Sequence, residues 1–148
     1  MYKNHVLEPF QKTILKNVTF KGVGLHSGLN IEVKILPAEE NYGIVFKRTD
    51  LDKNNFIEAN FKNVCSAKLC TTLQNEFKIT VSTVEHLLAA LYITGIDNAL
   101  IEISNSEVPI MDGSSKEFVE TINEAGVKRL NAKRKYLKIT KKFELIEN

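Results

Sequence analysis

The spacing of apolar and polar residues changes along the chain, and the change predicts where strands give way to helices. Residues 31–36 alternate apolar and polar side chains up to Pro37, as a half-buried strand does. Residues 44–46 predict another strand, and short apolar groups between about residues 50 and 78 predict a small β insert on the main sheet. The first half of the chain is therefore expected to be strands separated by turns.

Helical spacing begins after residue 80. Apolar residues at i, i+3, i+4 and i+7 counted from Val84 follow Ser82 and precede Gly95, so we expect a helix beginning at Ser82. A strand is expected at 99–103 and a second helix at 114–125. The apolar stripe of the second helix comprises Phe118, Ile122 and Ala125. This order predicts an α+β fold in which two helices pack on one face of a mainly antiparallel sheet.

Composition agrees with one globular domain. The 148 residues are 43% hydrophobic and 26% charged, and no apolar run reaches the length of a membrane span. Residues 1–10 lack the apolar core of a signal peptide, and two cysteines do not make a disulfide framework. We therefore expect a cytoplasmic protein without a transmembrane segment.

The charges divide the chain at about residue 127. Residues 1–127 carry 12 basic and 16 acidic side chains, whereas residues 128–148 carry 8 basic and 2 acidic ones. A basic segment is a weak indication of nucleic-acid binding. Apolar residues from Tyr136 to Ile146 are interspersed among these charges, which favours a strand entering further structure. We therefore expect no nucleic-acid partner.

Candidate chemistry lies at the start of the first helix. The helix is apolar nearly all round and is expected to be largely buried, and Glu85 and His86 are its ionisable groups apart from Tyr92. Ser82 and Glu85 fit a capping box, and His86 fits a core histidine, so a purely structural role is open. The positive end of a helix also favours an ionised Glu and a neutral His, which a general base and a metal ligand require. No standard zinc motif decides between the two interpretations.

Five motifs in order carry a resemblance to a known family. They are Gly22–Gly28, Leu69–Leu73, Ser82–His86, Gly95–Asn98 and Glu107–Gly113. Together they resemble the UDP-3-O-acyl-N-acetylglucosamine deacetylases, the zinc amidases of the committed step of lipid A synthesis in Gram-negative bacteria. The resemblance extends from about Gln11 to Ile139.

The resemblance implies a role for particular residues. Glu85 matches the general base, His86 matches one zinc ligand, and His26, Leu69 and Cys70 match positions lining the substrate cleft. The β insert at about 50–78 matches the segment bordering that cleft. We expect Glu85 and His86 to open onto a concave surface near His26 and Cys70.

The resemblance also implies a longer enzyme. Members of the family have two similar α+β domains, so residues 1–127 would be the first domain and 128–148 the start of the connection to a missing second one. The second domain would supply the other zinc ligands, a His and an Asp, and the catalytic acid His, because this chain has only His5, His26 and His86. The isolated chain is then expected to be inactive towards the UDP-sugar lipid substrate. A non-catalytic binding module of the same fold is the alternative, and the presence of both Glu85 and His86 favours the enzyme.

Overall fold

A five-stranded sheet forms the centre of the molecule. A computed structural model describes residues 9–136, 138–142 and 144–145. The strand order of the main sheet is β2-β3-β9-β4-β5, in which β4 and β9 run parallel and the other neighbours antiparallel. Its strands are β2 (Val18–Val23), β3 (Asn30–Pro37), β4 (Ile44–Arg48), β5 (Phe56–Glu58) and β9 (Ala99–Ile103).

Two smaller antiparallel units accompany the main sheet. One is a pair formed by the first and last strands, and the other is a three-stranded sheet in the order β6-β7-β8. Their strands are β1 (Phe10–Ile14), β10 (Val127–Lys133), β6 (Val64–Ser66), β7 (Thr72–Gln74) and β8 (Thr80–Val81), with a 3₁₀ turn at Phe61–Asn63. Because β5 pairs with β4, the segment expected as one insert at about 50–78 is divided between the main sheet and the small one.

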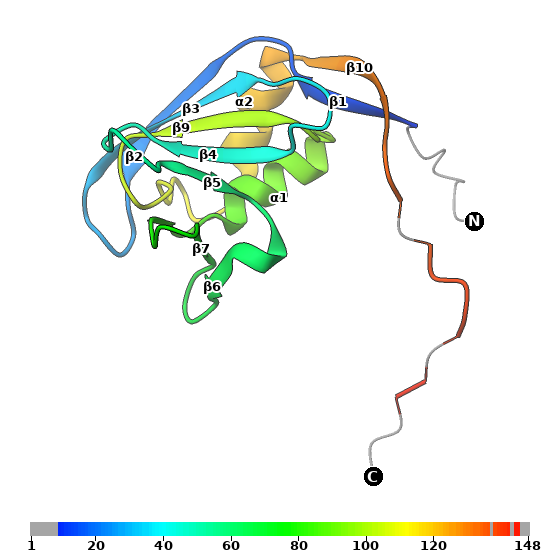
Figure 1. The fold of residues 1–148 in the computed structure, drawn as a ribbon. Helices are drawn as coiled ribbons and strands as arrows, with labels where there is room; N and C mark the ends of the chain where they lie inside the picture. Colours follow the sequence, from blue (N-terminus) through cyan, green and yellow to red (C-terminus); the bar gives the residue numbers. More distant parts are fainter. Residues whose placement is uncertain (1–8, 137, 143, 146–148) are drawn as a thin grey trace.

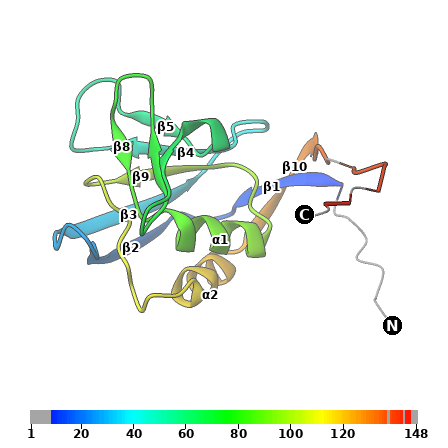
Figure 2. The same cartoon turned by 90° about the horizontal axis from the view of Figure 1, so that it is seen from below.

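Both α-helices, α1 (Glu85–Thr94) and α2 (Lys116–Ala125), lie on the same face of the main sheet, as Figures 1 and 2 show. The expected α+β class with two helices on one face is therefore confirmed. The predicted stripe of α2 is buried, and the Phe118 ring meets the Phe20 ring of β2 edge to face, with centroids 4.9 Å apart. Among the described residues, neither helix is long and apolar enough to cross a membrane.

The first helix departs from its sequence pattern in two respects. It begins at Glu85 and not at Ser82, because Ser82 forms a β-bridge with Glu107 and its backbone is thereby held extended. It is also not buried all round, since Tyr92 is 86% exposed and Ile93 66% exposed. A helix lying on one face of a sheet buries the side that meets the core, here Leu87, Ala90 and Leu91, whatever the polarity of its other side.

The basic segment leaves the sheets after β10. Arg134 donates from Nε to Asp97 Oδ1 (2.8 Å) and from a terminal nitrogen to the Gly95 carbonyl (2.6 Å), which fixes the chain where it departs. The described residues beyond Arg134 form no strand and extend away from the main sheet (Figure 1). Of the strand expected within residues 133–146, residues 137, 143 and 146 lie outside the described part of the chain. His5 lies outside it as well.

Candidate functional site at the start of helix α1

Glu85 connects the start of α1 to the small sheet. Its Oε2 accepts a hydrogen bond from the Thr71 backbone N–H at 2.9 Å, and its other oxygen has no hydrogen-bond partner among the described residues. The capping-box interpretation is wrong, since the residue that precedes the helix is Val84 and no side chain caps it. The Ser82 hydroxyl donates instead to the Ser106 carbonyl at 3.2 Å. The Glu85 carboxylate therefore lies in the first turn of α1 and is held by the backbone of the β6–β7 hairpin.

His86 is half-buried, so it is not enclosed in the core. Its backbone carbonyl accepts a hydrogen bond from the Ser115 hydroxyl at 2.9 Å, which joins the starts of α1 and α2. Its ring atom Nδ1 is buried and has no hydrogen-bond partner among the residues that the structure describes. A buried polar atom without a partner is costly, and a metal ion or a bound substrate could supply the missing interaction. The ring therefore fits the part of a metal ligand.

The other predicted cleft residues lie on two loops. Leu69 is 85% exposed at the tip of the hairpin between β6 and β7, where its φ of 68° is left-handed. Cys70 directly precedes Thr71, so the bond from Thr71 to Glu85 brings this part of the hairpin to the start of α1. The Cys70 and Cys65 thiols are both free.

His26 lies on the exposed loop between β2 and β3, and Glu107 holds that loop. Oε1 of Glu107 accepts from the His26 backbone N–H (2.9 Å) and Oε2 from the Ser27 N–H (2.8 Å). Oε1 also accepts from the Thr83 hydroxyl (3.1 Å), two residues before Glu85. The backbone of the His26 loop is thereby joined to the residues leading into α1.

The importance of Glu107 was not predicted. Burial favours a raised pKa for this carboxyl, but hydrogen bonds from the Ser27 side chain, the His26 and Ser27 backbone and the Thr83 side chain outweigh it and hold its pKa below the usual value. No local pattern in the sequence pointed to this acid, because its neighbours, including Gly24, are far from it along the chain. A Cβ added at Gly24 would lie 2.4 Å from Oε2 of Glu107, so the glycine leaves room for the carboxylate.

The described residues do not hold a complete metal site. No group of three or more His, Cys, Asp or Glu side chains among them could bind a metal ion. His86 is thus a candidate ligand whose companions are not found in this part of the polypeptide.

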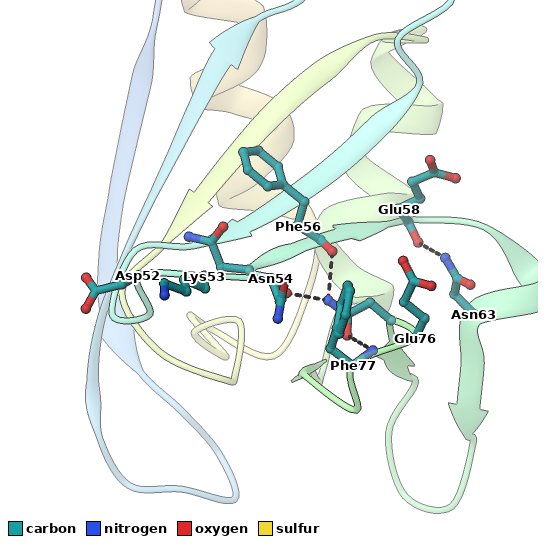
Figure 3. Close-up of a pocket in the computed structure, with 10 residues that line it drawn as sticks. Asp52, Lys53, Asn54, Phe56, Glu58, Asn63, Glu76 and Phe77 are labelled. Carbon is teal, nitrogen blue, oxygen red and sulfur yellow. Dashed lines mark hydrogen bonds between the residues drawn. The ribbon is translucent and has the colours of Figure 1, made fainter.

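A separate hollow of about 660 Å³ lies beside β5 (Figure 3). Its walls come from the β4–β5 turn, β5, the end of the 3₁₀ turn and the turn before β8, and they include the half-exposed rings of Phe56 and Phe77. Asn75 Nδ2 donates to the carbonyls of Asn54 (2.6 Å) and Phe56 (3.0 Å) and so holds the two turns together. None of the predicted site residues lines this hollow.

Comparison with known proteins gives the family. A family model described as UDP-3-O-acyl N-acetylglycosamine deacetylase (LpxC) matches residues 11–148. A UDP-3-O-acyl-N-acetylglucosamine deacetylase of Shewanella frigidimarina (strain NCIMB 400) is 50% identical over 132 residues, which are 89% of this chain and 43% of the relative. That of Geobacter sp. (strain M21) is 47% identical over 138 residues, or 93% of this chain and 45% of the relative. The chain thus spans less than half the length of these relatives, and it belongs to the UDP-3-O-acyl N-acetylglycosamine deacetylase family.

Proposed function

We propose that this chain supplies the general base and one zinc ligand of a deacetylase that hydrolyses the N-acetyl group of UDP-3-O-acyl-N-acetylglucosamine, the committed step of lipid A synthesis. The carrying observation is that Nδ1 of His86 is buried without a hydrogen-bond partner among the described residues, and that His86 directly follows Glu85 in the first turn of α1. The names of the relatives support the reaction and the substrate.

In this proposal Glu85 and His86 have different roles in the reaction. When bound, zinc would supply Lewis-acid chemistry, polarising the acetamide carbonyl and making the attacking water more acidic. His86 would hold the ion through a ring nitrogen. Glu85, fixed by the Thr71 N–H through Oε2, accepts the proton of the attacking water at Oε1. His26, Leu69 and Cys70 border the acetylated sugar, and the products are acetate and a free glucosamine amine.

The remaining zinc ligands and the catalytic acid belong, in this proposal, to a second domain that packs against residues 1–127, with residues 128–148 leading towards it. A cytoplasmic location is proposed from the two free thiols, which suit a reducing compartment.

Two substitutions in the assembled enzyme test these roles. Glu85→Gln should lower kcat about 10²–10⁴-fold with the zinc content unchanged. His86→Ala should instead lower the affinity for zinc. Glu117→Gln is the matched control, because Glu117 is an exposed acid in the first turn of α2 and should have no effect. A Glu85→Gln protein that loses zinc but keeps its rate per bound metal would show that the roles are wrongly assigned.

A further inference from the structure

One carboxylate joins the His26 loop to the start of α1. Glu107 is 2% exposed, and its Oε1 accepts both the His26 N–H at 2.9 Å and the Thr83 hydroxyl at 3.1 Å. Oε2 accepts the Ser27 N–H at 2.8 Å. His26 and Ser27 are themselves exposed, so these bonds to a buried anion tie down an otherwise solvent-facing turn.

The backbone is strained at the position that Glu107 holds. Thr83 has a φ of 55°, which is unfavourable for a β-branched residue and persists only where its surroundings enforce it. Thr83 is also 3% exposed, and its hydroxyl bonds to the Glu107 carboxylate. Because Glu85 follows two residues later, the conformation of Thr83 sets the direction in which α1 begins.

The backbone around Glu107 is anchored independently of its side chain. The Val108 N–H donates to the Ser82 carbonyl at 3.0 Å, and the Ile110 N–H donates to the Val23 carbonyl at 3.0 Å. Loss of the carboxylate therefore leaves this segment attached to both β2 and the residues before α1. The contribution of the side chain can be measured separately.

We infer that Glu107 is a positioning residue, which holds the His26 loop and the strained Thr83 turn in one arrangement so that His26 is presented to the site formed by Glu85 and His86. The inference rests on the proposed function, since it assigns these three residues to one substrate. Glu107 acts through its neighbours and does not itself touch the reacting atoms.

Amide hydrogen exchange in the 148-residue chain measures the positioning directly. In Glu107→Gln, one acceptor oxygen becomes an NH₂ group, so exchange should accelerate about tenfold or more at whichever of the His26 and Ser27 amides faces that group. Gly24→Ala should also accelerate this exchange, because its Cβ would meet the Ser27 hydroxyl at 2.2 Å and Oε2 of Glu107 at 2.4 Å and would push the loop and the carboxylate apart. Unchanged exchange at both amides in both variants would overturn the inference.

Two controls separate positioning from general loss of stability. Glu102→Gln removes a carboxylate of β9 that pairs with Lys47 at 3.0 Å and should leave exchange at the His26 amide unchanged. Ile57→Val truncates a fully buried side chain of β5 and should lower the thermal midpoint without a selective effect on the His26 loop. An equal acceleration in Ile57→Val would mean that Glu107 matters only through overall stability, and it would contradict the inference.

The kinetic consequence is measured in the assembled enzyme. Glu107→Gln should lower kcat about tenfold to a hundredfold with a small change in KM, because a misplaced group impairs the reacting geometry more than binding. Faster exchange together with an unchanged kcat would overturn the role in catalysis. An assembled wild-type protein without deacetylase activity would contradict the proposed function, whereas the exchange result would still decide whether Glu107 holds the loop.

Discussion

Replacing Asn98 tests whether a motif residue serves the fold and not the chemistry. Asn98 is 1% exposed, its Oδ1 accepts the Gly43 N–H at 2.9 Å, and its Nδ2 donates to Gln11 Oε1 at 3.0 Å. These bonds link β1, the start of β4 and the residues before β9. Asn98→Ala leaves the Gly43 donor without its acceptor, whereas Gln11 Oε1 keeps the bond from the Asn41 N–H at 2.9 Å.

The loss of stability in Asn98→Ala can be estimated from these contacts. An orphaned donor costs about 1–3 kcal/mol and the loss of a neutral hydrogen bond about 1 kcal/mol, so Asn98→Ala should lower the free energy of unfolding by about 2–4 kcal/mol. For a chain of this length the thermal midpoint should fall by about 6–12 °C. Amide exchange at His26 should not accelerate selectively, because the Asn98 contacts do not involve Glu107.

Urea and thermal unfolding followed by circular dichroism provide the assay. Asn123→Ala is the matched control, since Asn123 is exposed on α2 and its replacement should change stability by about 0.5 kcal/mol or less. A loss below about 1 kcal/mol for Asn98→Ala would refute the value assigned to the buried network.

Two further predictions concern the main sheet and its helices. Asp50→Asn should lower the free energy of unfolding by about 1.5–3 kcal/mol at pH 7, because Oδ1 of Asp50 accepts a hydrogen bond from Nε of the buried Arg48 at 2.7 Å. The hydrogen bond from Arg48 holds the pKa of Asp50 below its usual value, so this stabilisation is complete above the unfolded pKa of about 3.9 and is lost as the pH falls through the lower folded pKa. A difference between variant and wild type in urea unfolding that persists unchanged at pH 2 would contradict this. Phe118→Ala, which removes the ring packed on Phe20, should cost about 3–5 kcal/mol in the same assay, and a cost below 1 kcal/mol would show that α2 is held by other contacts.

Local periodicity predicted those elements whose buried side can be identified from their own residues. The stripe of Phe118, Ile122 and Ala125 is buried because a 3.6-residue repeat puts these side chains on one side of a helix. The alternation at 31–36 predicted the buried side of β3 in the same way, since Ile31, Val33 and Ile35 are all buried. Such patterns fix which side of an element is buried before any tertiary partner is known.

The capping box failed because a tertiary contact overrode a local one. Ser82 has the spacing to cap α1, but the chain returns at Ser106 and Glu107 and pairs with it. Glu107 was overlooked for the same reason, since the residues that donate hydrogen bonds to it, His26, Ser27 and Thr83, lie 24 to 81 positions away from it along the chain. The exposed side of α1, with Tyr92 and Ile93, shows that an apolar sequence does not itself say which neighbours will cover a helix.

The central claim, that Glu85 and His86 form part of a zinc site completed by another segment, is tested most directly by reconstitution. The 148-residue chain is mixed with the part of the Shewanella frigidimarina relative that it does not match, and zinc uptake and acetate release from UDP-3-O-acyl-N-acetylglucosamine are measured together. Zinc uptake and acetate release should appear only in the mixture, and acetate release should be lost with Glu85→Gln. Stoichiometric zinc and turnover from the 148-residue chain alone, or a mixture whose activity survives Glu85→Gln, would contradict the account.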